Sequence, residues 1–330
     1  MRFGLISGAH VHTPGYVKSI VEGDDSELSV VWDDMEDRGQ HWAREAGALY
    51  VADLGQAAAA DVDGFVVCAE NSKHRDLLEP LIRSGKAVFC EKPLEVSASE
   101  ARKAADLARE VGNNLLLGYF QPMSAEKQGV LQALRDGGIG KVTHARYRNA
   151  HHAAYGRWFD NPHSAWFTDK QLAGGGAFLD MGTHAVHLLR TLLGPMERVW
   201  AHIDNVSGIY PDVDDRGVAV IACASGALAT VEAAWVQTGG PGGLEVTGSE
   251  GTICEDGSGG YTIHAPGENP VAVAPRQSRP TGIDRLRASI KGDLSADEID
   301  DDLTCAVDAV AITEASYRSS ESGTWETMGG

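Results

Sequence analysis

The sequence has little positive charge and few cysteines, and both shortages exclude classes of protein. Its 330 residues include 28 Lys and Arg against 47 Asp and Glu, which gives a formal net charge of −19. We therefore expect neither a basic face for nucleic acid nor a polybasic patch for a membrane surface. The five cysteines form no Cys-x-x-Cys pair and are odd in number, which favours free thiols and a cytoplasmic protein.

Long apolar runs are also absent. The first run, residues 3–6, is too short for the core of a signal peptide, and no segment approaches the ~20 apolar residues of a membrane helix. We expect no membrane association. A chain of 330 residues with 43% hydrophobic side chains is too long for one ordinary core, so two domains are expected.

The first 120 residues alternate apolar strands with amphipathic helices. Helix signals include Thr13 as N-cap before Pro14, and a capping box formed by Ser97 and Glu100. Strands and helices of these lengths in alternation predict a parallel, doubly wound α/β sheet over residues 1–120. The strands are predicted at 2–7, 27–34, 62–70, 86–93 and 114–119, with helices at 72–85 and 97–112 among them.

The pattern changes after residue 120. Longer strands with partial alternation, separated by glycine-rich turns, predict an open and mostly antiparallel sheet over residues 121–330. Helices are expected at 175–193 and 295–319. The first domain is predicted to bind a dinucleotide, and the second to bind substrate and to form oligomers.

The loop after the first strand has one glycine where dinucleotide folds have three. The pattern G-x-G-x-x-G falls on Gly8, His10 and Thr13. The loop still joins a strand to a helix whose free N–H groups and positive dipole end suit a phosphate. Asp33 ends the second strand, where a carboxylate accepts hydrogen bonds from a ribose diol and repels a 2′-phosphate. This favours NAD over NADP, with Asp34 as the adjacent alternative.

Two further stretches contain side chains suited to proton transfer. Lys92 ends a strand at the edge where open α/β sheets bind ligands, and a partly desolvated lysine there can donate a proton or hold an alcohol oxygen. Asp180 and His184 are four residues apart on a predicted helix and share a face. A neighbouring carboxylate raises an imidazole pKa and suits a general base. A solvated lysine and a surface ion pair are the alternatives.

These stretches occur in a recognisable order. The strand–loop–helix at the start, AENSKH (69–74), CEKP (90–93) and AGGGAFLDMGTHAVHLL (173–189) together resemble the Gfo/Idh/MocA family of NAD(P)-dependent oxidoreductases. The resemblance covers nearly the whole chain. It implies a Rossmann domain, a C-terminal α/β domain with an open sheet, NAD as cofactor, and a sugar, cyclitol or related polyol oxidised or reduced at a secondary alcohol. It also implies a homodimer or homotetramer formed through the C-terminal sheet.

The resemblance assigns roles by position. Lys92 corresponds to the lysine of the family's E-K-P motif, near nicotinamide and substrate hydroxyl. Asp180 and His184 correspond to its active-site pair, with His184 taking the hydroxyl proton as hydride leaves for nicotinamide. The residues expected at the cofactor are Gly8, His10, Val11, His12, Asp33, Asn71, His74 and Glu91.

The substrate side departs from the family pattern. The segment 118–123 lacks an arginine often found there, and His187 stands where an acidic residue is usual. The loop 151–168 is rich in aromatic and polar side chains, which suit the C–H faces and hydroxyls of a sugar or, alternatively, hold the loop to the protein. The residues expected at the substrate are Tyr119, Gln121, Tyr155, Arg157, Trp158, His163 and His187.

Twelve histidines raise the question of a metal. Asp180, His184 and His187 have a spacing that suits zinc, although no metal is expected. Two functional alternatives remain. An enzyme of this fold can retain its NAD and eliminate or epimerise a glycoside, and a non-catalytic relative can sense a sugar or nucleotide. The combination of Lys92, Asp180 and His184 favours an enzyme, because a sensor needs no proton-transfer set.

Overall fold

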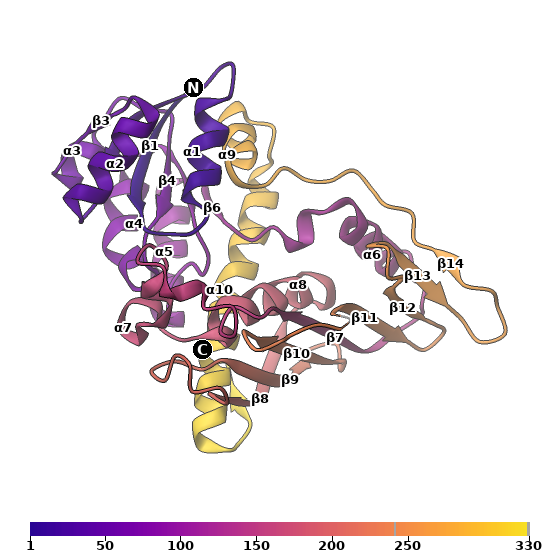
Figure 1. Ribbon diagram of the computed structural model, residues 1–330. Coiled ribbons are helices and arrows are strands. Elements are labelled where there is room, and N and C mark those ends of the chain that lie inside the picture. The colour runs from indigo at the N-terminus through magenta and orange to yellow at the C-terminus, as the bar shows by residue number, and fades with distance from the viewer. Residues whose placement is uncertain (241, 329–330) are drawn as a thin grey trace.

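The computed structural model describes residues 1–240 and 242–328, which form two sheets with helices packed between and around them (Figure 1). The first sheet has six parallel strands in the order β3-β2-β1-β4-β5-β6. The strands are β1 (Arg2–Gly8), β2 (Glu27–Trp32), β3 (Leu49–Tyr50), β4 (Gly64–Cys68), β5 (Ala87–Cys90) and β6 (Leu115–Leu117). This confirms the predicted doubly wound sheet.

Helices cover both faces of this sheet, so its central strands are apolar throughout. Every residue of β4 is buried, as expected of a strand covered on two sides. The helices are α1 (Thr13–Val21), α2 (Glu36–Ala46), α3 (Leu54–Ala58), α4 (His74–Arg83), preceded by the 3-10 turn η1 (Asn71–Lys73), and α5 (Ala98–Val111).

Two predictions about helix caps were wrong. The N-cap of α1 is His12, one residue before Thr13. Ser97 is the N-cap of α5 as predicted, but the capping box is absent: its side chain makes no capping bond, and Glu100 is paired with Lys103 at 2.7 Å.

The second sheet has nine strands in the order β14-β13-β12-β11-β7-β10-β9-β8-β15. Its pairings are antiparallel except between β7 and β10, which confirms the mostly antiparallel prediction. The strands are β7 (Val142–Ala150), β8 (Met196–Asp204), β9 (Arg216–Cys223), β10 (Leu228–Ala234), β11 (Gly243–Gly248), β12 (Thr252–Glu255), β13 (Tyr261–His264), β14 (Val271–Ala272) and β15 (Glu326–Thr327).

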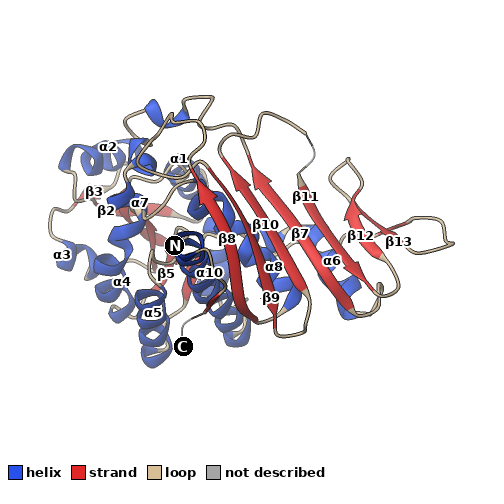
Figure 2. Cartoon of the chain, turned by 90° about the horizontal axis from the view of Figure 1, so that it is seen from below, coloured by secondary structure: helices blue, strands red, loops and turns tan. Residues whose placement is uncertain are grey.

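One face of this second sheet is covered and the other is open. The helices α8 (Thr183–Leu193) and α10 (Ala296–Ser322) pack against it, and Figure 2 shows the opposite face with no helix over β7 to β10. The remaining elements are η2 (Gln121–Met123), α6 (Ala125–Arg135), η3 (Trp158–Asp160), η4 (Ala165–Thr168), α7 (Lys170–Ala173), the π-helical turn η5 (Phe178–Gly182) and α9 (Gly282–Lys291).

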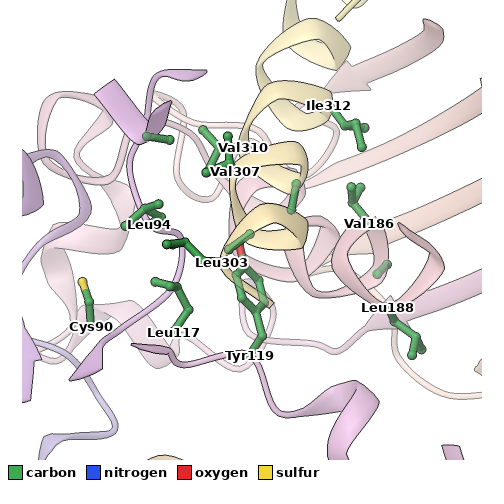
Figure 3. Close-up of a cluster of buried hydrophobic side chains, with 14 of the residues drawn as sticks. Cys90, Leu94, Leu117, Tyr119, Val186, Leu188, Leu303, Val307, Val310 and Ile312 are labelled. Atoms are coloured by element: carbon green, nitrogen blue, oxygen red, sulfur yellow. The ribbon is translucent and has the colours of Figure 1, made fainter. Parts of the chain in front are cut away.

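The end of the chain joins the two sheets. The helix α9, absent from the sequence prediction, packs Ile283 and Leu286 into the core of the first sheet. The helix α10 then passes between the sheets, where Leu303 and Val307 face Leu117 of β6 (Figure 3). A cut at residue 120 would therefore separate α9 from the sheet on which it packs. Within the described residues, no helix has the length and apolar composition needed to span a bilayer.

Candidate active site

A cavity of about 330 Å³ lies where the carboxyl end of the first sheet meets the second domain. The loop after β1, the residues after β5, the turn η5 and the loop after β7 all contribute to its wall. Its lining residues are His10, Val11, His12, Lys92, Phe120, Asn149, His151, Trp158, Phe159, Ser164, Phe167, Asp180, Met181 and His184. All three predicted catalytic residues are among them.

Lys92 and Asp180 form an ion pair in the wall of the cavity. Lys92 Nζ lies 2.7 Å from Asp180 Oδ1 and 3.3 Å from the Asp180 carbonyl oxygen. The indole Nε1 of Trp235 donates to Asp180 Oδ2 at 3.0 Å. Burial alone would raise the pKa of Asp180, but Lys92 and Trp235 outweigh it and hold this pKa below its usual value. Asp180 is therefore ionised and forms an ion pair with the Lys92 side chain.

The glycines before Asp180 allow the turn that holds it. A side chain at Gly176 would place its Cβ 2.0 Å from the Asp214 carbonyl oxygen. The Asp214 carboxylate accepts the N–H groups of Gly176 (2.8 Å) and Phe178 (2.7 Å), and the Tyr317 hydroxyl donates to the same carboxylate. Asp180 thus lies in a π-helical turn whose N-terminus is capped by the half-buried carboxylate of Asp214, and π turns of this kind are frequent at functional sites.

His184 lines the cavity one turn after Asp180. Its Nδ1 is buried and has no partner among the described residues, and its ring forms part of the cavity wall. Burial lowers the pKa of His184 well below 6.5, Lys92 lowers it further, and Asp180 opposes both only in part. The expectation that Asp180 raises this pKa above its ordinary value was therefore wrong, because desolvation dominates. His184 is neutral and able to accept a proton.

The loop after β1 places two histidines beside Glu91. Glu91 is fully buried and accepts bonds from His12 Nδ1 (2.9 Å), the Tyr16 hydroxyl and the Lys92 N–H (3.0 Å). Burial would raise the pKa of Glu91, but His10, His12 and Lys92 lower it below its usual value. The loop and Lys92 are therefore held by one carboxylate.

His10 occupies the position of the second glycine. Its Nδ1 accepts the His12 N–H at 3.3 Å, and burial lowers its pKa to about 3. The ring is therefore neutral with its proton on Nε2, and this nitrogen is buried without a partner in the described structure. An unpaired buried donor on the wall of the cavity suits an acceptor oxygen of a bound ligand.

Asp33 is more buried than a carboxylate that binds the ribose diol of a cofactor is expected to be. Its side chain is fully buried and accepts bonds from the N–H groups of Gly8 and Met35 and from Arg38 Nε, each at 2.8 Å. Asp34 is 36% exposed and pairs with Arg38 and Lys73. Asp34 is therefore the more accessible of the two carboxylates at the end of β2.

Two residues predicted to bind the cofactor, Asn71 and His74, lie outside the cavity and contact the segments that form its wall. The Asn71 side chain donates to the Ala173 carbonyl at 2.9 Å, and His74 Nδ1 donates to the Pro93 carbonyl at 3.0 Å. Burial lowers the pKa of His74. Both residues are buried and lie outside the cavity lining, so they brace the segments that carry α7 and Lys92.

Among the predicted substrate residues, Trp158 alone lines the cavity. Tyr119 and His187 are buried and stack on each other, with ring centroids 4.0 Å apart. Three residues separate His184 and His187 in α8, so their side chains point in different directions, and only His184 lines the cavity. Exposed positions outside the lining are Tyr155, Arg157 and His163, and Gln121 begins η2 outside it as well.

Sequence reasoning missed Phe120, Asn149, His151 and Trp235. The His151–His152 pair carried a weak signal, since one of two adjacent residues on a strand end faces inward, and His151 does so while His152 is exposed. Trp235 follows β10 with no local motif to mark it. Its role depends on a contact with Asp180, 55 residues away.

The ligand atoms of His10, His12 and Glu91 lie within 4.8 Å of one another. Their present bonds use the same atoms, because His10 Nδ1 accepts a backbone N–H and Glu91 Oε1 accepts from His12 and Tyr16. The predicted alternative set fails, since His187 is turned away from Asp180 and His184. We assign no metal to either set.

A dinucleotide fits the groups at this edge of the first sheet. The N-terminus of α1 has no side-chain cap, so it can face a phosphate. A Cβ at Gly8 would lie 2.1 Å from Trp42 Nε1, so the first glycine of the loop is required. Residues 2–119 match the family model described as "Oxidoreductase family, NAD-binding Rossmann fold", and residues 128–254 match "GFO/IDH/MocA C-terminal domain".

The chain belongs to the Gfo/Idh/MocA family. It is an oxidoreductase with an NAD-binding Rossmann domain. A curated relative, the 1,5-anhydro-D-fructose reductase of Ensifer adhaerens, is 27% identical over 308 residues, or 88% of each chain. The inositol 2-dehydrogenase of Rhizobium meliloti (strain 1021) is 28% identical over 262 residues, 78% of this chain and 76% of its own. The solved structure of GenD2 from gentamicin A biosynthesis in complex with NAD has a TM-score of 0.79 and 27% identity, covering 100% of this chain and 97% of its own.

The Trp235–Asp180 bond generates a first prediction. Trp235→Phe keeps a ring in the core and removes the donor to Asp180 Oδ2, so the ion pair loses its orientation. We expect kcat to fall about tenfold, while the Kd for NAD changes less than twofold. Steady-state kinetics and fluorescence titration measure the two values. Trp32→Phe is the matched control, because that indole donates to the Ala52 carbonyl far from the cavity and its loss should leave kcat unchanged.

The buried position of His187 generates a second prediction. Burial lowers its pKa to about 4, against about 6.5 in an unfolded chain. The unfolded state therefore binds more protons between these values, and stability is lost as the pH falls from about 6.5 to 4. In His187→Phe this loss is smaller, so Tm should fall less than in the wild type between pH 7.5 and pH 5. Equal losses would show that His187 does not titrate in this way. KM should not change.

Proposed function

We propose that this protein is an NAD-dependent dehydrogenase that acts on a secondary alcohol of a sugar, cyclitol or related polyol. The observation that supports it is the meeting of the Lys92–Asp180 pair and neutral His184 in one cavity, at the sheet edge where dinucleotides bind. The names of the relatives, among them a reductase of an anhydro sugar and an inositol dehydrogenase, support the substrate class.

The residues that would hold NAD are Gly8 to His12 with the N-terminus of α1 at the pyrophosphate, and the end of β2 at the adenosine ribose. There the carboxylates of Asp33, Asp34 and Glu70 outnumber the cations Arg38 and Lys73, with which they are already paired. A 2′-phosphate would add negative charge to this cluster, so we infer a preference for NAD over NADP.

Side chains of the cavity account for the transfer of the proton from the substrate hydroxyl. NAD, when bound, accepts the hydride from the carbinol carbon. Neutral His184 takes the hydroxyl proton on Nε2 as the carbonyl forms. The Lys92 ammonium holds the alcohol oxygen and stabilises the charge that develops on it, and Asp180 keeps that ammonium in place. In the reverse direction His184 returns the proton.

A nucleotide titration tests this proposal. After removal of any nucleotide that co-purifies, we expect tryptophan fluorescence to report NAD binding at least tenfold tighter than NADP binding. Asp34→Asn should narrow that ratio, because it removes an accessible negative charge. Lys92→Met should lower turnover of polyols by at least 10³-fold and leave the Kd for NAD within threefold. A protein that neither binds nor retains nucleotide is no dehydrogenase, and turnover without added NAD would identify a retained cofactor.

We further propose that the open face of the second sheet joins copies of the chain, as a dimer or tetramer, in the cytoplasm. The half-buried side chains of Trp200, Val218 and Val220 form an apolar strip across β8 and β9 on this face. Arg146 and Glu245, paired at 3.4 Å, lie farther out in the sheet, on β7 and β11, two and three strands away from β9. An apolar centre with a charged rim is typical of subunit interfaces. The cysteines of the chain are all free, which supports a reducing compartment.

Light scattering tests the interface. The wild type should have a mass of two or four times 35.0 kDa. Val220→Arg buries a charge at the centre of the proposed interface and should shift that mass toward the monomer, with NAD binding unchanged. Val271→Arg is the control, because Val271 is 61% exposed on the edge strand β14. A monomeric wild type would overturn the proposed oligomer. An oligomer whose mass is unchanged in Val220→Arg would place the interface on another surface.

A further inference from the structure

The cavity contains one pair of opposite charges, and both members are already bonded. Lys92 is the one lysine or arginine among the described residues that line the cavity, and its ammonium has two bonds to Asp180. Both Asp180 oxygens are bonded as well, to Lys92 and to Trp235. Arg157, on the neighbouring loop, is exposed and paired with Asp160 at 2.9 Å. The third N–H of the Lys92 ammonium is therefore the one cationic donor that the described lining leaves for a ligand, and Asp180 already neutralises its charge.

The remaining polar groups of the wall are neutral, and His151 is the best defined of them. Its Nδ1 accepts the Ala153 N–H at 3.2 Å, so the proton of the neutral ring is on Nε2. Burial lowers the pKa of its imidazole, which keeps the ring in this form. Backbone bonds to Ala234 (3.0 Å) and Gln237 (2.9 Å) fix the residue at the end of β7. Its ring lies 4.9 Å from that of Trp158.

Asn149 provides the complementary group two residues earlier. Its Nδ2 donates to the Met181 carbonyl at 2.8 Å, which leaves Oδ1 as an acceptor. Side chains at i and i+2 of a strand lie on the same face, and both residues line the cavity. A donor and an acceptor side by side match an alcohol, since a hydroxyl both accepts and donates. Trp158 adds an aromatic surface that is 47% exposed.

From these contacts we infer that the cavity selects an uncharged polyol over anionic sugars, and that His151 is a specificity-determining residue whose Nε2–H donates to a substrate hydroxyl. The inference rests on the proposed function, because it concerns the substrate of the same site. A carboxylate or phosphate entering the cavity would lose water and gain only one N–H of an ammonium that Asp180 already neutralises, and it would approach the Asp180 carboxylate. The desolvation of a hydroxyl group costs less free energy than that of an anion, and the cavity offers a hydroxyl both a hydrogen-bond donor and an acceptor.

Matched pairs of uncharged and anionic substrates test the inferred selection for uncharged polyols. With NAD, we would compare methyl glucosides with methyl glucuronides, and inositols with inositol monophosphates. We expect kcat/KM to be at least 100-fold higher for the uncharged member of each pair that reacts. Higher kcat/KM for the anionic members, or turnover of no uncharged member by a protein that binds NAD, would overturn the inference. Failure to bind NAD at all would instead overturn the proposed function, so the two failures are distinguishable.

Variants of His151 test the donor. His151→Phe keeps a ring beside Trp158 and removes the N–H, whereas His151→Gln keeps an N–H. We expect the Phe variant to raise KM for the uncharged substrate about tenfold with kcat within threefold, and the Gln variant to recover most of the loss. His152→Phe, at the exposed neighbour, is the control. The Kd for NAD, measured by fluorescence, should stay within twofold in all three. Equal KM values for the Phe and Gln variants would overturn the role of His151.

Discussion

The ion pair between Lys92 and Asp180 is the contact on which the site depends. Lys92 follows a strand of the first sheet, and Asp180 belongs to the second domain, 88 residues later. Two buried charges are stable together only when each has enough partners, and here they have them: Trp235 donates to Asp180, and Asp180 gives Lys92 both a carboxylate and a carbonyl oxygen. The pair therefore links the two domains at the cavity, and it holds the ammonium to which we assign the alcohol oxygen.

Burial gives the rest of the site its chemistry. The ammonium of Lys92 and desolvation together keep His184 neutral, which a general base requires, and desolvation also keeps His10 and His151 neutral. Histidines that would be partly cationic in water therefore act here as acceptors and donors without charge. The cavity is nearly neutral although the chain has a net charge of −19, because Lys92 and Asp180 in its lining compensate each other.

Much of the fold could be predicted because its signals are local. Buried strands alternating with capped helices indicate a parallel sheet, and Lys92, Asp180 and His184 stand in stretches with strong local patterns. The failures depend on geometry that no short pattern contains. His187 stacks on Tyr119, Arg38 folds onto Asp33, and α9 returns to a sheet almost two hundred residues earlier. Trp235 acts through its contact with Asp180, 55 residues away, so its sequence neighbours do not mark it.

The loop that lacks two glycines is explained by the same constraints. A glycine at the second position normally lets the backbone approach a pyrophosphate. Here His10 fills that position, packs beside Trp166 and Phe167 of the second domain, and keeps one N–H unpaired at the cavity wall. The Trp166 indole also donates to the Ala9 carbonyl, so the second domain holds the loop directly. In this loop the side-chain N–H of His10 stands where a second glycine would let the backbone approach a phosphate. Contacts from both domains set the position of that side chain. Its shape is therefore coupled to the Lys92–Asp180 pair through Glu91, which bonds to His12 and to the backbone of Lys92.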